Sequence, residues 1–119
     1  MLKIYTYAGC STCRRAVKWL NEREIAHTCL PIRDKPPSVA EIEAMLDARG
    51  GKILSIFNTS GQDYRRLGLS EKHRHMSRQE ILKLLAGNGN LLKRPFLIDD
   101  QSHVCLNGFN LKEWVEQLT

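Results

Sequence analysis

Cys10 and Cys13, near the start of the chain, are separated by Ser11 and Thr12 and form a CxxC motif. The motif lies where a predicted strand passes into a predicted helix. Free N–H groups in the first turn of a helix carry partial positive charge, which stabilises a thiolate at Cys10. Cys13 is one turn away, close enough to attack a mixed disulfide formed on Cys10. The spacing therefore predicts a redox-active pair of thiols.

Zinc binding and a purely structural role are the alternatives for two cysteines at this spacing. A structural zinc site takes four cysteine or histidine ligands, and the chain contains no second CxxC. His73 and His75 form its only closely spaced histidine pair, and their spacing suits a zinc finger poorly. We therefore favour redox chemistry and expect no metal.

Two strands and a helix must position the motif. Residues 2–7 are rich in β-branched and aromatic side chains and predict a strand. Residues 14–23 place their apolar side chains on one stripe and predict a helix. Residues 27–32 predict a second strand. Because the helix connects the two strands, they form a βαβ unit and should be parallel.

The rest of the chain adds helices and then a hairpin. Capping-box sequences at Ser38 and Ser77 each predict the start of a helix. Between these two helices, residues 52–76 favour short helices joined by turns. Residues 95–106 predict a hairpin, and residues 111–118 an amphipathic helix. The order is βαβ, a helical insert, then ββα, which predicts one α/β domain over residues 1–119, with a thioredoxin-like plan and a mixed central sheet.

Composition excludes some classes of function. The chain has 119 residues, 42% of them apolar, which suits one globular domain with its own core. It contains no apolar run of the roughly 20 residues that a membrane span needs. Met1 leads directly into a strand without a leader sequence, so we expect a cytoplasmic protein. The net charge of +5 favours an anionic substrate or an acidic protein surface and is too modest to predict direct nucleic-acid binding.

Four segments together resemble the arsenate-reductase-related (ArsC/Spx/MgsR-like) family: YTYAGCSTCRRA at 5–16, FNTSGQDYR at 57–65, MS at 76–77 and LLKRPF at 91–96. The resemblance extends over nearly the whole chain, in order. It implies a thioredoxin-like fold in which the first cysteine of the motif, here Cys10, is the reactive one.

The resemblance also implies roles for three further residues. Pro95 matches a proline that is cis in the family and faces the cysteine loop. Arg94 matches an arginine that contacts the bound anion, and Arg14 matches the arginine four residues after the reactive cysteine. These residues are expected to bind substrate.

Three positions depart from the arsenate-reductase pattern. Asn58 and Leu106 align with two further arginines that surround the oxyanion, and Thr6 replaces a histidine. Asn58 is then a neutral member of the substrate site, expected to hydrogen-bond near the cysteine loop. A doubly charged oxyanion needs several cationic donors, so we expect arsenate reduction to be weak or absent.

Together these features predict a thiol–disulfide oxidoreductase in which Cys10 attacks and Cys13 resolves. Arg94 and Arg14 would hold the anionic end of the substrate, and glutathione with glutaredoxin, or thioredoxin, would supply the electrons without any organic cofactor. The alternative is an Spx-like redox-sensing regulator that binds the C-terminal domain of the RNA polymerase α subunit.

The remaining cysteines are expected in the core, and the two tryptophans are expected to be core residues or half-buried anchors. Cys29 and Cys105 lie in predicted strands, and free cysteine is among the most buried residue types. Trp19 and Trp114 lie on the apolar stripes of predicted helices. Cys10 is therefore expected to be the most exposed of the four cysteines.

Overall fold

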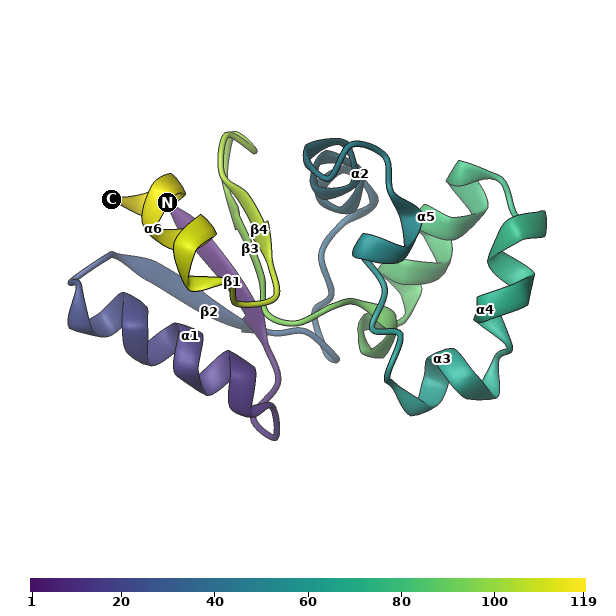
Figure 1. The fold of residues 1–119 in the computed structure, drawn as a ribbon, viewed down its shortest axis with the longest axis horizontal. Coiled ribbons are helices and arrows are strands. Elements are labelled where there is room, and N and C mark those ends of the chain that lie inside the picture. Colours follow the sequence, from purple (N-terminus) through teal and green to yellow (C-terminus); the bar gives the residue numbers. More distant parts are fainter.

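A four-stranded mixed sheet forms the centre of the computed structural model, which describes residues 1–119 (Figure 1). The strands lie in the order β2-β1-β3-β4 and are β1 (Leu2–Thr6), β2 (His27–Pro31), β3 (Phe96–Asp99) and β4 (Cys105–Asn107). β1 pairs parallel with β2 and antiparallel with β3, and β3 pairs antiparallel with β4. The predicted parallel βαβ unit, the hairpin and the mixed sheet are confirmed.

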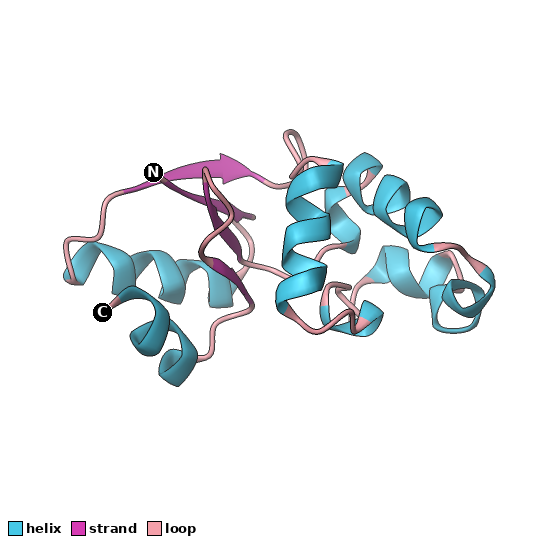
Figure 2. Cartoon of the chain, turned by 90° about the horizontal axis from the view of Figure 1, so that it is seen from above, coloured by secondary structure: helices cyan, strands magenta, loops and turns pink.

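The chain also forms six α-helices, which are α1 (Ser11–Glu22), α2 (Val39–Ala48), α3 (Gln62–Arg66), α4 (Leu69–Lys72), α5 (Arg78–Gly87) and α6 (Leu111–Leu118). Both predicted capping boxes are present, at the starts of α2 and α5. α3 and α4 are the short helices expected in the insert. The insert, from α2 to α5, lies beside the sheet on the side away from α1 and α6 (Figures 1 and 2). No helix is both long and apolar enough to cross a membrane.

β1 contributes to two hydrophobic cores, because successive side chains of a strand point to opposite faces of the sheet. Ile4 packs on the face covered by α1 and α6, in a cluster with Ala16, Trp19, Leu20, Leu97, Leu106 and Trp114. Tyr5 points to the other face and joins the larger core of the insert, which includes residues of α2 and α5. The sheet is therefore the middle layer between two sets of helices.

The two tryptophans are core residues, as expected. Trp19 is 7% exposed and Trp114 fully buried, and their rings meet edge to face with centroids 6.1 Å apart. Such a pair contributes about 0.5–1.5 kcal/mol beyond the area that it buries. This contact fixes α6 against α1 on one face of the sheet.

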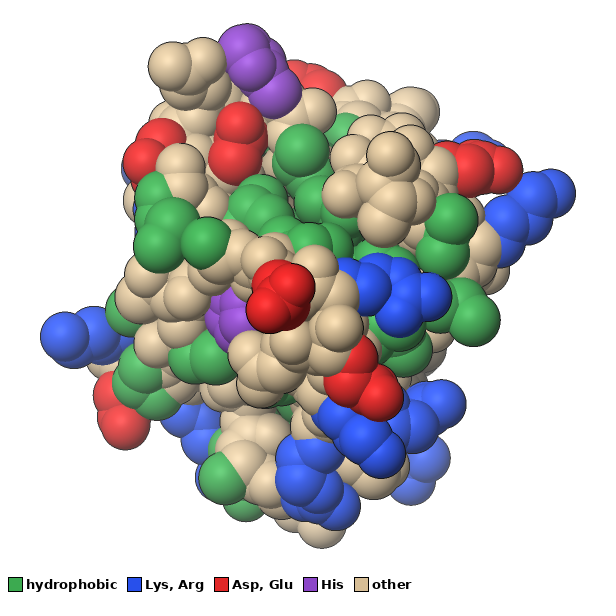
Figure 3. All heavy atoms as spheres, turned by 90° about the vertical axis from the view of Figure 1, so that its left-hand side faces the viewer, with side chains coloured by type: hydrophobic (Ala, Val, Ile, Leu, Met, Phe, Trp, Pro, Cys, Tyr) green, Lys and Arg blue, Asp and Glu red, His purple; other side chains and the backbone are tan.

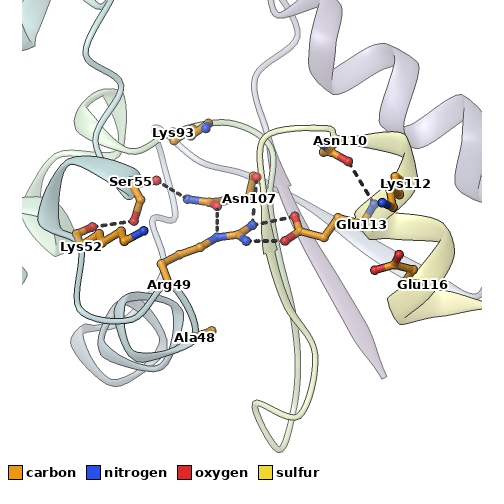
Figure 4. A pocket seen from close by; sticks show the side chains of 10 residues that line it. All are labelled: Ala48, Arg49, Lys52, Ser55, Lys93, Asn107, Asn110, Lys112, Glu113 and Glu116. Atoms are coloured by element: carbon orange, nitrogen blue, oxygen red, sulfur yellow. Dashed lines mark hydrogen bonds and ion pairs between the residues drawn. The ribbon is translucent and has the colours of Figure 1, made fainter.

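Arg49, the residue that follows α2, connects the insert to the sheet and to α6 (Figure 4). Its guanidinium donates two hydrogen bonds to the carboxylate of Glu113, and its Nε donates to Oδ1 of Asn107 at 2.9 Å. Nδ2 of Asn107 donates to the carbonyl of Ser55 at 2.8 Å. The hydrogen bonds from Arg49 hold the pKa of Glu113 below its usual value. One polar network thus joins α2, β4 and α6.

Replacing Asn107 by alanine should destabilise the protein. The side chain is 5% exposed, and its loss leaves Nε of Arg49 and the Ser55 carbonyl unpaired. We expect the free energy of unfolding to fall by about 1–3 kcal/mol. Urea denaturation followed by tryptophan fluorescence measures it. Lys112→Ala, an exposed change beside the same network, should stay within about 0.5 kcal/mol. Equal losses in the two variants would contradict this account of the network.

Candidate redox site

Cys10 is the N-cap of α1. Its backbone is extended, and its Sγ accepts a hydrogen bond from the N–H of Cys13 at 3.2 Å. The helix begins at Ser11, three residues before the predicted start, because a cysteine sulfur takes the place of the usual capping oxygen. The position predicted for Cys10, between strand and helix, is confirmed. Donation from a first-turn N–H stabilises negative charge on its sulfur.

The two thiols of the motif differ in environment. Cys10 is half-buried, whereas Cys13 is 1% exposed. Burial, followed by the hydrogen bond with Cys10, raises the pKa of Cys13 to about 12. Cys13 therefore remains a thiol at neutral pH, and Cys10 is the member of the pair that a substrate can reach. All four cysteines of the chain are free.

Cys29 is not a core residue, so that expectation is wrong for it, and Cys105 is only partly buried, at the edge of the larger core. Cys29 is exposed and Cys105 half-buried, and Cys10 is therefore not the most exposed cysteine. Cys29 lies on β2 and Cys105 on β4, which are the two edge strands of the sheet. Edge strands are covered less completely than central ones, and the sequence of a strand does not reveal its position in the sheet.

The Arg94–Pro95 peptide bond is cis, as the resemblance implies. Phe96 pairs with Tyr5 in the antiparallel β1–β3 ladder, so Pro95 falls opposite Thr6, the last residue of β1. Pro95 is buried there. The proline thus lies beside the end of the strand that leads into the cysteine loop.

The ring of Tyr7 contacts both the cysteine loop and two arginines. A Cβ at Gly9 would lie 2.7 Å from Cε2 of the ring, so the ring packs directly on the backbone next to Cys10. Cζ of Arg33 lies 3.7 Å from the ring centroid, and Cζ of Arg94 lies 5.1 Å from it. Tyr7 also accepts a hydrogen bond from the N–H of Cys10 through its carbonyl, at 3.0 Å.

Arg33 is a site residue that sequence reasoning missed. Its neighbour Ile32 donates a backbone hydrogen bond to the carbonyl of Thr6 at 2.9 Å, which continues the parallel pairing of β1 and β2. Arg33, the second residue after β2, is therefore brought close to Tyr7, the residue after β1. The parallel βαβ unit, which was predicted, was the signal that could have placed Arg33 here.

The two arginines that contact Tyr7 also line a polar cavity of about 520 Å³. Arg33, Arg94 and Asn58 line it, together with Ser60, Gly61, Gln62, Asp63 and Asn90. The structure thus brings together two of the predicted substrate-binding residues, Arg94 and Asn58. Hydrogen bonds from Asn88, followed by one from Arg66, lower the pKa of Asp63, so the cavity also contains an ionised carboxylate.

Arg14 lies apart from that cavity. Its guanidinium donates to the carbonyl of Ala8 at 2.7 Å, within the loop that carries Cys10. It lines a second cavity, of about 480 Å³, with Cys13 and Cys29. The contact seen for Arg14 is therefore with the loop backbone, on the side of α1.

Leu106 occupies no substrate site. It is 1% exposed and belongs to the core beneath α1 and α6. Leu106 therefore contributes to this core and not to the cavity that Arg94 and Asn58 line. Of the two positions that depart from the arsenate-reductase arginines, only Asn58 lines the cavity.

The face formed by α1 and α6 carries positive charge at its lower end. Lys and Arg side chains gather in the lower part of this view, where α1 lies, and apolar atoms show through its centre (Figure 3). Exposed cations of α1 and the residue after it are Arg14, Arg15, Lys18 and Arg23. They add a positive field along the length of α1.

Comparison with known proteins identifies the family of this chain. The model of the ArsC family matches residues 5–117. The uncharacterised protein YusI of Bacillus subtilis is 44% identical over 100 residues, covering 84% of this chain and 85% of YusI. The global transcriptional regulator Spx of Enterococcus faecalis is 31% identical over 85% of this chain and 75% of its own. A crystal structure described as a possible arsenate reductase from Streptococcus mutans UA159 is 39% identical, covers 92% of both chains and superposes with a TM-score of 0.85. The chain, with its thioredoxin-like fold, therefore belongs to the ArsC family.

Proposed function

We propose that this protein is a thiol–disulfide oxidoreductase in which Cys10 is the nucleophile and Cys13 the resolving thiol. The observation that carries the proposal is the difference between the two sulfurs. Sγ of Cys10 is partly exposed and accepts an N–H at the start of α1, whereas the thiol of Cys13 is buried and has a raised pKa. The sulfur of Cys10 is available to attack a substrate, and the thiol of Cys13, one turn away, stays protonated until it resolves the mixed disulfide.

The exchange proceeds in two steps. The thiolate of Cys10 attacks one sulfur of a substrate disulfide RS–SR′, which forms a Cys10–SR mixed disulfide and releases R′S⁻. Cys13 then loses its proton, its sulfur attacks Sγ of Cys10, and RS⁻ leaves. The products are an intramolecular Cys10–Cys13 disulfide and, after they take up two protons, two substrate thiols.

The cycle closes when a reductant returns two electrons to the Cys10–Cys13 disulfide. Two glutathione molecules, acting directly or through glutaredoxin, or one thioredoxin dithiol would supply them and would themselves become oxidised. We also propose a cytoplasmic location, because glutathione and thioredoxin keep thiols reduced in the cytoplasm. The reaction as proposed uses the chain's own sulfurs and no resident metal or organic cofactor.

A redox-sensing regulator is the second candidate, because Spx of E. faecalis is similar over 85% of this chain. In this case the Cys10–Cys13 pair would act as a switch, and the partner would be the C-terminal domain of the RNA polymerase α subunit. Pulldown with that domain, using reduced and oxidised protein, tests the idea. Redox-dependent binding without turnover of disulfides would favour the regulator over the enzyme.

Serine substitutions should separate the roles of the two cysteines. Cys10→Ser should abolish exchange with glutathione disulfide, because the other thiol in the first turn of α1, that of Cys13, is buried. Cys13→Ser should instead trap one glutathione on Cys10, because the resolving attack is lost. Mass spectrometry of the intact protein and of its peptides measures both results. Cys29→Ser is the control and should behave like the wild type. Trapping on another cysteine in Cys13→Ser would refute the assignment.

The raised pKa of Cys13 predicts unusual alkylation. In Cys10→Ser, we expect the rate of iodoacetamide reaction at Cys13 to keep rising through pH 10, because burial holds its pKa well above the value of about 8.5 for a free cysteine. In urea the same thiol should approach a plateau near pH 9. Peptide mass spectrometry distinguishes Cys13 from the exposed Cys29. A plateau below pH 9 in the folded protein would show that Cys13 is not protected.

Arsenate should be reduced weakly or not at all, and Asn58→Arg should improve turnover. Asn58 lines the cavity with Arg33 and Arg94, where a third guanidinium would add charged hydrogen bonds. Such bonds contribute about 1.5–3 kcal/mol each, which corresponds to a gain of at least tenfold. Glutaredoxin-coupled turnover of arsenate measures this, with Asn58→Gln as the neutral control. Efficient turnover by the unmodified protein would show that two guanidiniums suffice.

A further inference from the structure

Arg33 and Arg94 are two positive charges without a negative partner. Neither takes part in any ion pair of the structure. Both guanidiniums nevertheless lie over the same ring, that of Tyr7, and line the same cavity. Like charges held together in this way repel each other unless an anion joins them. The aromatic ring restricts both groups without neutralising either.

We propose that Arg33 and Arg94, held on Tyr7, form a binding site for the carboxylate of a small peptide disulfide whose sulfur meets Cys10. The inference rests on the proposed thiol–disulfide exchange and adds to it the chemical class of the substrate. It assigns to Arg33 the anchoring role that the sequence suggested for Arg14. A planar guanidinium suits this role, because it can donate two parallel hydrogen bonds to one carboxylate.

A carboxylate on the lining of the cavity favours a singly charged ligand group over a doubly charged oxyanion. Arg33 and Arg94 supply the unpaired positive charges, whereas Asp63 is paired with Arg66 through Oδ1 at 3.2 Å and accepts a hydrogen bond from Asn88 through Oδ2 at 3.1 Å. The carboxylate of Asp63 repels a dianion such as phosphate or arsenate more strongly than it repels the single charge of a ligand carboxylate.

The position and size of the site agree with a peptide disulfide. The ring of Tyr7 contacts both guanidiniums and also packs on the backbone of Gly9, which immediately precedes Cys10. A ligand held by its carboxylate at Arg33 and Arg94 therefore has to extend about the length of this ring to present a sulfur to Cys10. The cavity of about 520 Å³ is within the range of 300–1,000 Å³ that is usual for small-molecule sites.

The first test compares an anionic with a neutral disulfide. Rates of exchange at Cys10 are measured with glutathione disulfide and with hydroxyethyl disulfide, which has no carboxylate. We expect Arg33→Gln to lower the ratio of these two rates at least tenfold, since hydrogen bonds to charged groups contribute about 1.5–3 kcal/mol. Arg33→Lys, which keeps the charge and loses the planar fork, should give an intermediate ratio.

Arg65→Gln is the matched control, because Arg65 is exposed, forms no ion pair and lies outside this cavity. Its ratio should equal that of the wild type. A structural defect in Arg33→Gln would slow both disulfides equally and leave the ratio unchanged. An unchanged ratio would overturn the proposal, and so would an equal fall in Arg65→Gln.

A binding measurement tests the site even if no disulfide is turned over. S-methylglutathione, which cannot exchange, is titrated into the reduced protein and followed through the amide signals of Tyr7 and Gly9. We expect Arg33→Gln to raise its Kd at least tenfold, and the dimethyl ester of the same ligand to bind far more weakly. Binding of S-methylglutathione without turnover would refute the proposed function and keep the site. Equal affinity of Arg33→Gln and wild type, or tighter binding of inorganic phosphate, would refute the site.

Discussion

β1 is the constraint on which the other elements depend, because it is buried on both faces and paired along both edges. Ile4 points into the core under α1 and α6, and Tyr5 into the core of the insert. A shift of the strand by one residue would exchange these two faces and place each side chain in the wrong core. The register of β1 therefore also fixes where the strand ends, and the cysteine loop begins at that end.

Three segments that are distant in sequence meet at this end of β1. Parallel pairing brings the residues after β2 to it, and antiparallel pairing brings the start of β3 to it. Tyr7, Arg33 and Arg94 are neighbours for this reason. The segment after β2 also packs closely on Gly89. A Cβ at Gly89 would lie 1.8 Å from the carbonyl oxygen of Ile32, so only glycine allows this approach. The site is thus assembled by backbone pairing, while its charge is set by side chains that the pairing only positions.

Local sequence signals were enough for most of the fold. Capping boxes marked α2 and α5, apolar stripes marked α1 and α6, and the family resemblance implied the cis bond before Pro95. What failed depended on long-range arrangement. Cys29 and Cys105 have the sequence of buried strands, but strand order leaves them on the edges. Arg33 became a neighbour of Arg94 only through the pairing of the sheet, and no local pattern in the sequence records it.

The sulfur of Cys10 both caps α1 and is the atom proposed to form bonds with substrate. Once that sulfur is joined to another, it carries no negative charge and accepts the N–H of Cys13 less well. A helix that loses its cap is weakened by about 1 kcal/mol. The first turn of α1 would then be loosest during the lifetime of the mixed disulfide. That is when the buried Cys13, whose own N–H has just been released, has to move toward its target.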